Sequence, residues 1–119
     1  MTLLNKNQIL SAVDRKAEDL EVKEWGGVVR ISTMSASDRD KWEQDTYGGE
    51  KTRTEDFRAR FVALCLVDEQ GERLFTDKDV AQLGAKSAAA LDRVFRAAQK
   101  LNALGDAAVE DAEKTDVPA

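Results

Sequence analysis

The sequence has no histidine, one cysteine and one proline among its 119 residues. Without histidine the chain lacks the commonest general base and any imidazole ligand for a metal. The single cysteine, Cys65, cannot form an internal disulfide, and alone it cannot complete a zinc site. It lies within an apolar run from 61 to 67, which indicates a buried side chain and a reducing compartment. We therefore predict a protein without catalytic residues, metal or cofactor.

Long apolar runs are also lacking. No run approaches the ~18 residues that a membrane span needs. The first residues, Met1-Thr2-Leu3, do not begin a charged and then apolar secretory signal. A composition with 42% hydrophobic and 34% charged residues is typical of a globular protein. We expect a single small domain in the cytoplasm with no membrane partner.

The net charge of −5 is concentrated near the end of the sequence. Of the 23 acids and 18 bases, five acids and one base lie between Asp106 and Ala119, which leaves 18 and 17 in residues 1–105. A nearly neutral body with both signs interspersed lacks the positive field that binds nucleic acid. The acidic, alanine-rich end is typical of disorder. The sequence thus predicts a globular domain over residues 1–105 and a flexible acidic tail over residues 106–119.

A β-hairpin is the clearest element of the first half. Residues 20–25 and 28–32 alternate between apolar and polar side chains on either side of Gly26-Gly27, which suits a two-residue turn. That turn would pair Trp25 with Val28. The face expected to be buried carries Leu20, Val22, Val29 and Ile31.

The rest of the chain is predicted to be helical. Asn5 with Gln8 forms a capping box before a short first helix. Three more such boxes follow, at Ser35/Asp38, Thr52/Glu55 and Thr76/Asp79. The last helix has an apolar stripe of Leu91, Val94, Phe95, Ala98 and Leu101. Residues 62–75 fit either a helix end or a second hairpin around the turn at 68–71. The fold class is therefore α+β, a mostly α-helical small domain with an N-terminal hairpin.

Four residues are candidates for partner binding: Trp25, Val28, Trp42 and Tyr47. If Trp25 and Val28 lie on the outer face of the hairpin, they form an aromatic anchor near its tip. If a helix covers that face, Trp25 is an ordinary core residue. Trp42 lies on a highly charged helix and either packs into the core or contacts a partner. Tyr47 precedes Gly48-Gly49, a loop of the kind that orders on assembly.

The charged residues provide weaker candidates for a functional site. The carboxylate pairs Asp38/Asp40 and Asp77/Asp79 lie at helix starts, where acids suit the helix dipole. Arg93, Arg96 and Lys100 form a basic stripe on the last helix. We interpret it as a solvated face, and docking of an acidic partner is the alternative.

In the order of its features, the sequence resembles the tail assembly chaperones of long-tailed, siphovirus-type phages and prophages. The matching segments are Trp25-Gly26-Gly27-Val28-Val29-Arg30, residues 68–75, the short helix at 77–83 and the helix end at 100–104. The resemblance spans roughly residues 18–105.

The resemblance implies a non-enzymatic role. Such proteins bind the tape measure protein in the host cytoplasm, keep it soluble and promote assembly of the tail tube, and they are absent from the mature virion. A frameshifted longer form often recruits the tail tube protein, with the region after Asp106 as the junction. Self-association is also expected. One rival is a small DNA-binding or antitoxin-like regulatory module that uses the basic stripe, and another is an enzyme subunit without its own active site.

Overall fold

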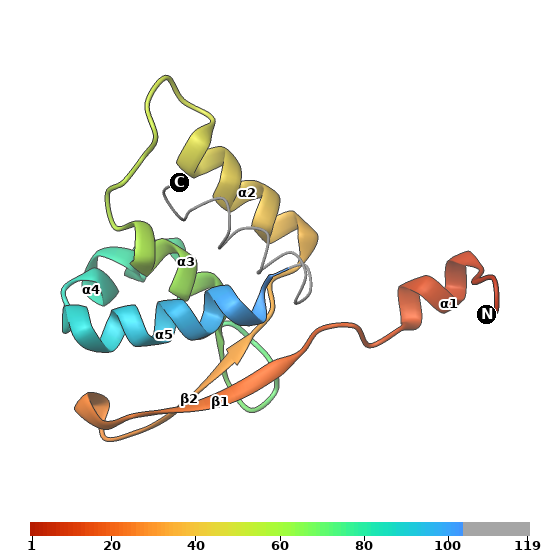
Figure 1. The fold of residues 1–119 in the computed structure, drawn as a ribbon, viewed down its shortest axis with the longest axis horizontal. Coiled ribbons are helices and arrows are strands. Elements are labelled where there is room, and N and C mark those ends of the chain that lie inside the picture. The colour runs from red at the N-terminus through yellow and green to blue at the C-terminus, as the bar shows by residue number, and fades with distance from the viewer. Residues whose placement is uncertain (104–119) are drawn as a thin grey trace, which may run out of the picture.

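The computed structural model describes residues 1–103. Its sheet joins a hairpin of β1 (Ala17–Val22) and β2 (Gly27–Ser32) to a two-residue strand, β3 (Leu66–Val67), in the order β1-β2-β3. All neighbouring strands are antiparallel (Figure 1). The inward face of the hairpin carries the predicted residues, with Val22 and Ile31 fully buried and Leu20 and Val29 half-buried.

The predicted register of the hairpin is wrong. Val22 lies opposite Gly27, and Leu20 lies opposite Val29. Residues Lys23–Trp25 leave the strand as a turn of 3-10 helix, and Gly26 closes the loop in the left-handed region with φ 76°. The register differs from the predicted one by an even number of residues. Because side chains alternate with period two, the predicted inward face stays inward.

Helix α2 (Ala36–Tyr47) begins at its predicted cap, where the Ser35 side chain accepts a hydrogen bond from the Asp38 N–H. The loop after it returns to the helix, since the Arg53 N–H donates to the Thr46 carbonyl at 2.7 Å. This loop, residues 48–56, rises beyond the end of α2 and then descends to the next helix (Figure 1).

Helix α3 (Phe57–Cys65) is the central helix, and residues 59–65 are all buried. It packs against α2, α4 and α5. The predicted cap at Thr52 is wrong, because the cap lies four residues later at Asp56, which has a positive φ of 47°. The Arg60 side chain binds the carbonyls of Arg53 and Glu55 and so holds this segment as a loop.

Residues 62–75 contain both of the predicted alternatives, a helix end and a turn back like that of a hairpin. The helix continues to Cys65, and the chain then forms β3 and turns back so that Arg73 bridges to Val67. The Asp68 carboxylate stabilises the turn by accepting from the backbone N–H groups of Gln70 and Glu72.

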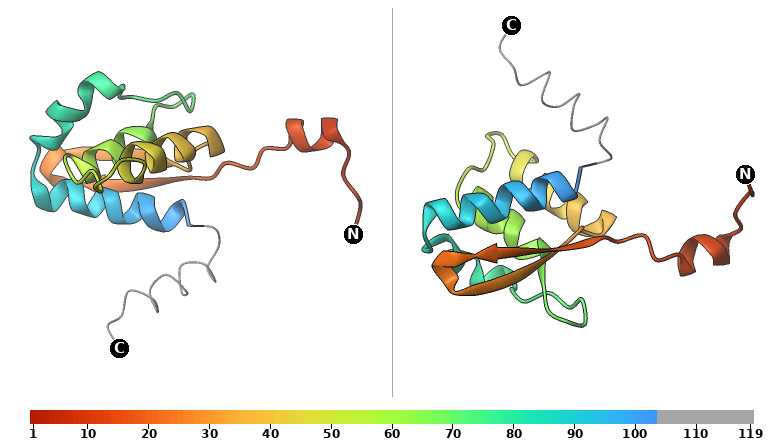
Figure 2. Two further views of the ribbon diagram at one scale, coloured as in Figure 1. Left: turned by 90° about the horizontal axis from the view of Figure 1, so that it is seen from above. Right: turned by 60° about the horizontal axis from the view of Figure 1, so that its bottom comes forward.

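The C-terminal part contains a short 3-10 turn (Asp77–Asp79), α4 (Val80–Gly84) and α5 (Ala88–Leu101). The predicted capping box of Thr76 and Asp79 is present. Helix α5 packs against α3 and against both long strands of the hairpin, and it runs along one side of them (Figure 2). Its predicted stripe is inward, with Leu101 half-buried and the other four residues buried.

The first helix, α1 (Lys6–Ser11), has the predicted capping box of Asn5 and Gln8. None of its residues is buried by the described chain, and Figures 1 and 2 show it standing apart from the body. We call residues 1–15 the N-terminal arm. The body begins at Lys16, whose carbonyl accepts from the Thr33 N–H. The structure thus confirms an α+β fold with an N-terminal hairpin, and the predicted acidic tail, residues 106–119, lies outside the described residues.

Candidate partner-binding surface

Trp25 lies at the tip of the hairpin, on the turn of 3-10 helix. Its ring is half-buried and packs against the core. Its Nε1–H is buried and has no acceptor within the described residues. Glu24 and Arg93 hold the tip in place, since both guanidinium Nη atoms donate to the carboxylate at 3.0 and 2.5 Å. These hydrogen bonds lower the pKa of Glu24.

Val28 is the large apolar residue exposed on the outer face of the hairpin, and it is 64% exposed. It lies opposite Glu21 on β1. Two residues along β2, Arg30 forms a bidentate pair with Asp19 on the same face. Hydrogen bonds from Arg30 lower the pKa of the Asp19 carboxyl. Val28 therefore stands as a single apolar contact in a charged surface.

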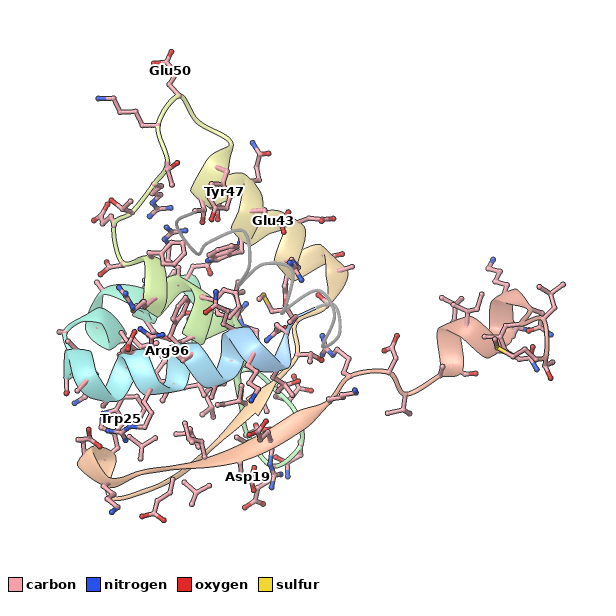
Figure 3. All side chains as sticks on the ribbon, in the orientation of Figure 1. Asp19, Trp25, Glu43, Tyr47, Glu50 and Arg96 are labelled. Carbon is pink, nitrogen blue, oxygen red and sulfur yellow. The ribbon has the colours of Figure 1, made fainter. Side chains whose placement is uncertain are left out.

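Trp42 and Tyr47 form a second candidate binding site, on the C-terminal half of α2. The Trp42 ring packs against Phe57 and Phe61 with centroids 5.3 and 5.1 Å away, and this contact fixes α2 on α3. The Tyr47 ring meets Trp42 edge-on at 6.0 Å and is 56% exposed. Figure 3 shows Tyr47 and Trp25 on opposite sides of the body, so the predicted residues of the hairpin and those of α2 do not form one site.

The N-terminal arm is an exposed apolar surface that is not among the predicted partner-binding residues. Its exposed residues are Met1, Leu3, Leu4, Ile9, Leu10 and Val13. An isolated helix of six residues is marginal in water, so its apolar residues need a partner to cover them. The signal in the sequence was a group of apolar residues on and beside a helix too short to be stable alone.

The basic stripe on α5 is largely compensated. Arg93 pairs with Glu24, and Arg96 pairs with Asp92 at 2.8 Å. Asp92 also binds Arg58, and these bonds lower its pKa. Lys100 makes no ion pair with any described residue. The stripe therefore offers one uncompensated charge rather than three.

Residues 1–103 contain few other candidate functional groups. This part of the chain contains no group of three acidic or cysteine side chains placed to hold a metal ion. Within the same residues, none of the helices has the length and apolar character needed to cross a bilayer. Cys65 is fully buried, and burial raises the pKa of its thiol to about 12.

Comparison with known proteins finds a match among the solved structures. No family model matches the sequence, and no curated protein is detectably similar to it. The solved structure of the bacteriophage HK97 tail assembly chaperone superposes with a TM-score of 0.62. The match covers 84% of this chain and 95% of that chain, at 17% sequence identity. The chain has the fold of a phage tail assembly chaperone.

This tail-assembly-chaperone fold confirms the resemblance predicted from the sequence. The identity of 17% is low, so the likeness is one of fold. The exposed apolar surfaces on this version of the fold are the N-terminal arm, Val28 on the sheet, Leu74 and the Trp42/Tyr47 site.

Proposed function

We propose that this chain is a phage tail assembly chaperone that binds the tape measure protein, keeps it soluble and promotes assembly of the tail tube without catalysis. The observation that carries the proposal is the fold, which matches the HK97 tail assembly chaperone over 84% of the chain. The exposed apolar arm adds support, because a chaperone of this kind must cover apolar stripes of its client.

The proposed mechanism is weak and multivalent binding. The arm, Val28 and Tyr47 each present apolar side chains, while Trp25 and Trp42 add the exposed edges of half-buried rings. A long client helix can hold many copies of a small protein. Proximity along one client then raises the overall affinity beyond that of a single contact. Self-association of neighbouring copies is part of the same proposal.

The remaining parts of the proposal concern where the protein acts and a longer form of the chain. The protein acts in the host cytoplasm and is absent from the mature virion. A frameshifted longer form recruits the tail tube protein through its extension. Helix α5 ends at Leu101, and the Asn102 side chain accepts from the Met34 N–H just before α2, so an extension of the chain would follow from this part of the body.

The DNA-binding or antitoxin-like alternative has less support. It relies on the basic stripe, and two of the three cations in that stripe already pair with Glu24 and Asp92. Binding to phosphates would have to replace those pairs. Retention on heparin at physiological salt, decreasing steeply as salt rises, would favour this alternative over the chaperone.

The proposal is tested by capture of the tape measure protein from the same phage or prophage on the immobilised chain. Ile9→Ser and Tyr47→Ser remove exposed apolar side chains and are expected to reduce capture at least threefold. Asn7→Ser and Gln44→Ser change exposed polar residues of the same two helices and serve as matched controls. Capture that is absent for the wild-type chain contradicts the proposal.

A further inference from the structure

A pocket of about 130 Å³ lies between α2, α3 and α4. This volume is several times the ~30 Å³ that one water molecule occupies in the liquid. Trp42, Leu64 and Val80 supply apolar wall. The pocket lies next to the exposed Tyr47, whose ring contacts Trp42. It therefore adjoins one of the proposed partner-binding sites.

Arg60 is the unusual group of this pocket, because it is a charged side chain only 8% exposed. Its guanidinium donates to the Glu55 carbonyl at 3.0 Å, the Thr46 hydroxyl at 2.8 Å and the Arg53 carbonyl at 2.7 Å. All three acceptors are neutral. A guanidinium has five N–H donors, so two remain after these bonds.

Within the described residues Arg60 forms no ion pair with a carboxylate. Six other arginines, each more exposed than Arg60, do form such pairs. Burial first, and then the nearby Arg53, lower the pKa of Arg60. A buried charge is normally paired, because desolvation without a counter-charge is costly. The carboxylates of Asp45, Asp56 and Glu55 act on Arg60 from a distance but form no ion pair with it, so its two remaining N–H donors suit an anion at contact distance.

The residues that line the pocket carry one more positive than negative charge. Lys41 pairs with Asp77 at 2.8 Å and is compensated. Arg53 and Arg60 then face one further acid among the lining residues, Asp45. A second unused donor is present as well, since the Trp42 Nε1–H is buried and has no acceptor among residues 1–103.

We propose that this pocket binds a carboxylate, which in the assembled complex is an aspartate or glutamate side chain of the bound partner. A carboxylate accepts several hydrogen bonds and balances the excess charge, while its short apolar stem contacts the Trp42 and Val80 walls. The partner segment then presents an acidic residue beside the apolar residue that meets Tyr47. The identity of the partner rests on the proposed function.

The site is tested first with acetate, on the full chain labelled with ¹⁵N. The sequence has two tryptophans, and Trp25 also has a buried, unpartnered Nε1–H away from the pocket. Acetate is expected to shift the Trp42 indole signal saturably, with a Kd on the order of 10 mM. The Trp25 signal should stay in place. Equal shifts of both signals, or the same shift with chloride at matched ionic strength, overturn the site.

A charge-matched pair of variants then tests the contribution of the pocket cations. Arg53→Gln removes a pocket cation and keeps the backbone carbonyl that binds Arg60. It is expected to weaken acetate binding at least threefold. Lys86→Gln makes the same change of net charge at an exposed position outside the pocket and should leave acetate binding unchanged. Equal effects of the two variants overturn the site.

The partner is tested by the same pair in capture of the tape measure protein. Arg53→Gln should reduce capture at least threefold and Lys86→Gln should not; equal capture overturns the partner assignment and leaves the acetate site standing. Failure of wild-type capture together with saturable acetate binding removes the proposed function alone. Neutralising the five acids between Asp106 and Asp116 provides a further check. If that change moves the Trp42 signal without acetate, the chain's own acids occupy the pocket and the partner assignment is overturned.

Discussion

Asn102 binds the backbone of Met34 across 68 residues of sequence. The Asn102 side-chain oxygen accepts from the Met34 N–H at 2.6 Å. Its amide nitrogen donates to the Ala98 carbonyl at 2.8 Å and contacts the Cys65 sulfur at 3.4 Å. One side chain thus fixes the end of α5 to the segment before α2 and to the end of α3.

The Asn102 contact predicts a clear loss of stability on truncation. Asn102→Ala leaves the partly buried Met34 N–H without its acceptor, which should lower the free energy of unfolding by about 1–3 kcal/mol. Gln99→Ala, at an exposed position of the same helix, should change it by less than about 0.5 kcal/mol. Urea denaturation followed by circular dichroism measures both, and equal values for the two variants would remove Asn102 from this role.

The loop of the hairpin predicts different effects at two adjacent glycines. Gly26 has φ 76°, whereas Gly27 does not lie in the left-handed region, and a Cβ at either meets nothing within 4 Å. Gly26→Ala should therefore cost about 1 kcal/mol, and Gly27→Ala should cost less or even stabilise. Thermal unfolding of the two variants gives the comparison. A similar loss at both positions would indicate the two-residue turn instead.

The two faces of β2 predict a second contrast. Ile31 is fully buried beneath the helices, so Ile31→Ala should lower the free energy of unfolding by about 2–5 kcal/mol. Val28→Ala removes methyl groups from an exposed side chain and should cost less than about 0.5 kcal/mol, while it weakens capture of the partner. A large stability loss at Val28 would show that another part of the chain covers the outer face.

The buried thiol predicts a decline of stability at high pH. Burial raises the pKa of Cys65 from 9.0 to about 12, so the folded protein keeps a proton that the unfolded chain loses between these values. The stabilisation is complete below pH 9 and decreases as the pH rises towards 12, by at most about 1.4 kcal/mol per unit. Urea midpoints of wild type and Cys65→Ala at pH 8 and pH 10.5 measure it. Parallel declines for both proteins would exclude the thiol as the cause.

Local patterns predicted much of this fold because each depends on few neighbours. The caps at Asn5, Ser35 and Thr76 were confirmed, since a capping box needs only residues three positions apart. The inward stripe of α5 follows in the same way from helical periodicity. The buried face of the hairpin was correct although the register was not, because alternation survives an even shift.

The errors involve contacts between distant residues. The cap at Thr52 failed because Arg60 holds the preceding carbonyls in a loop, an interaction that no local motif encodes. The turn of the hairpin was misplaced because Trp25 packs against the core and Glu24 binds Arg93, far along the chain. The unpaired burial of Arg60 was likewise invisible, since burial of a single charged residue depends on the tertiary fold.

The most direct test of the account is co-expression with the long, helix-rich tape measure protein encoded in the same phage or prophage. The soluble fraction of the tape measure protein is compared with and without this chain, and with the Asn7→Ser and Ile9→Ser variants of the arm. The account predicts that the tape measure protein becomes soluble and co-purifies with the wild type and with Asn7→Ser, and much less with Ile9→Ser. A tape measure protein that stays insoluble in every case, or is soluble alone and never co-purifies, would contradict it.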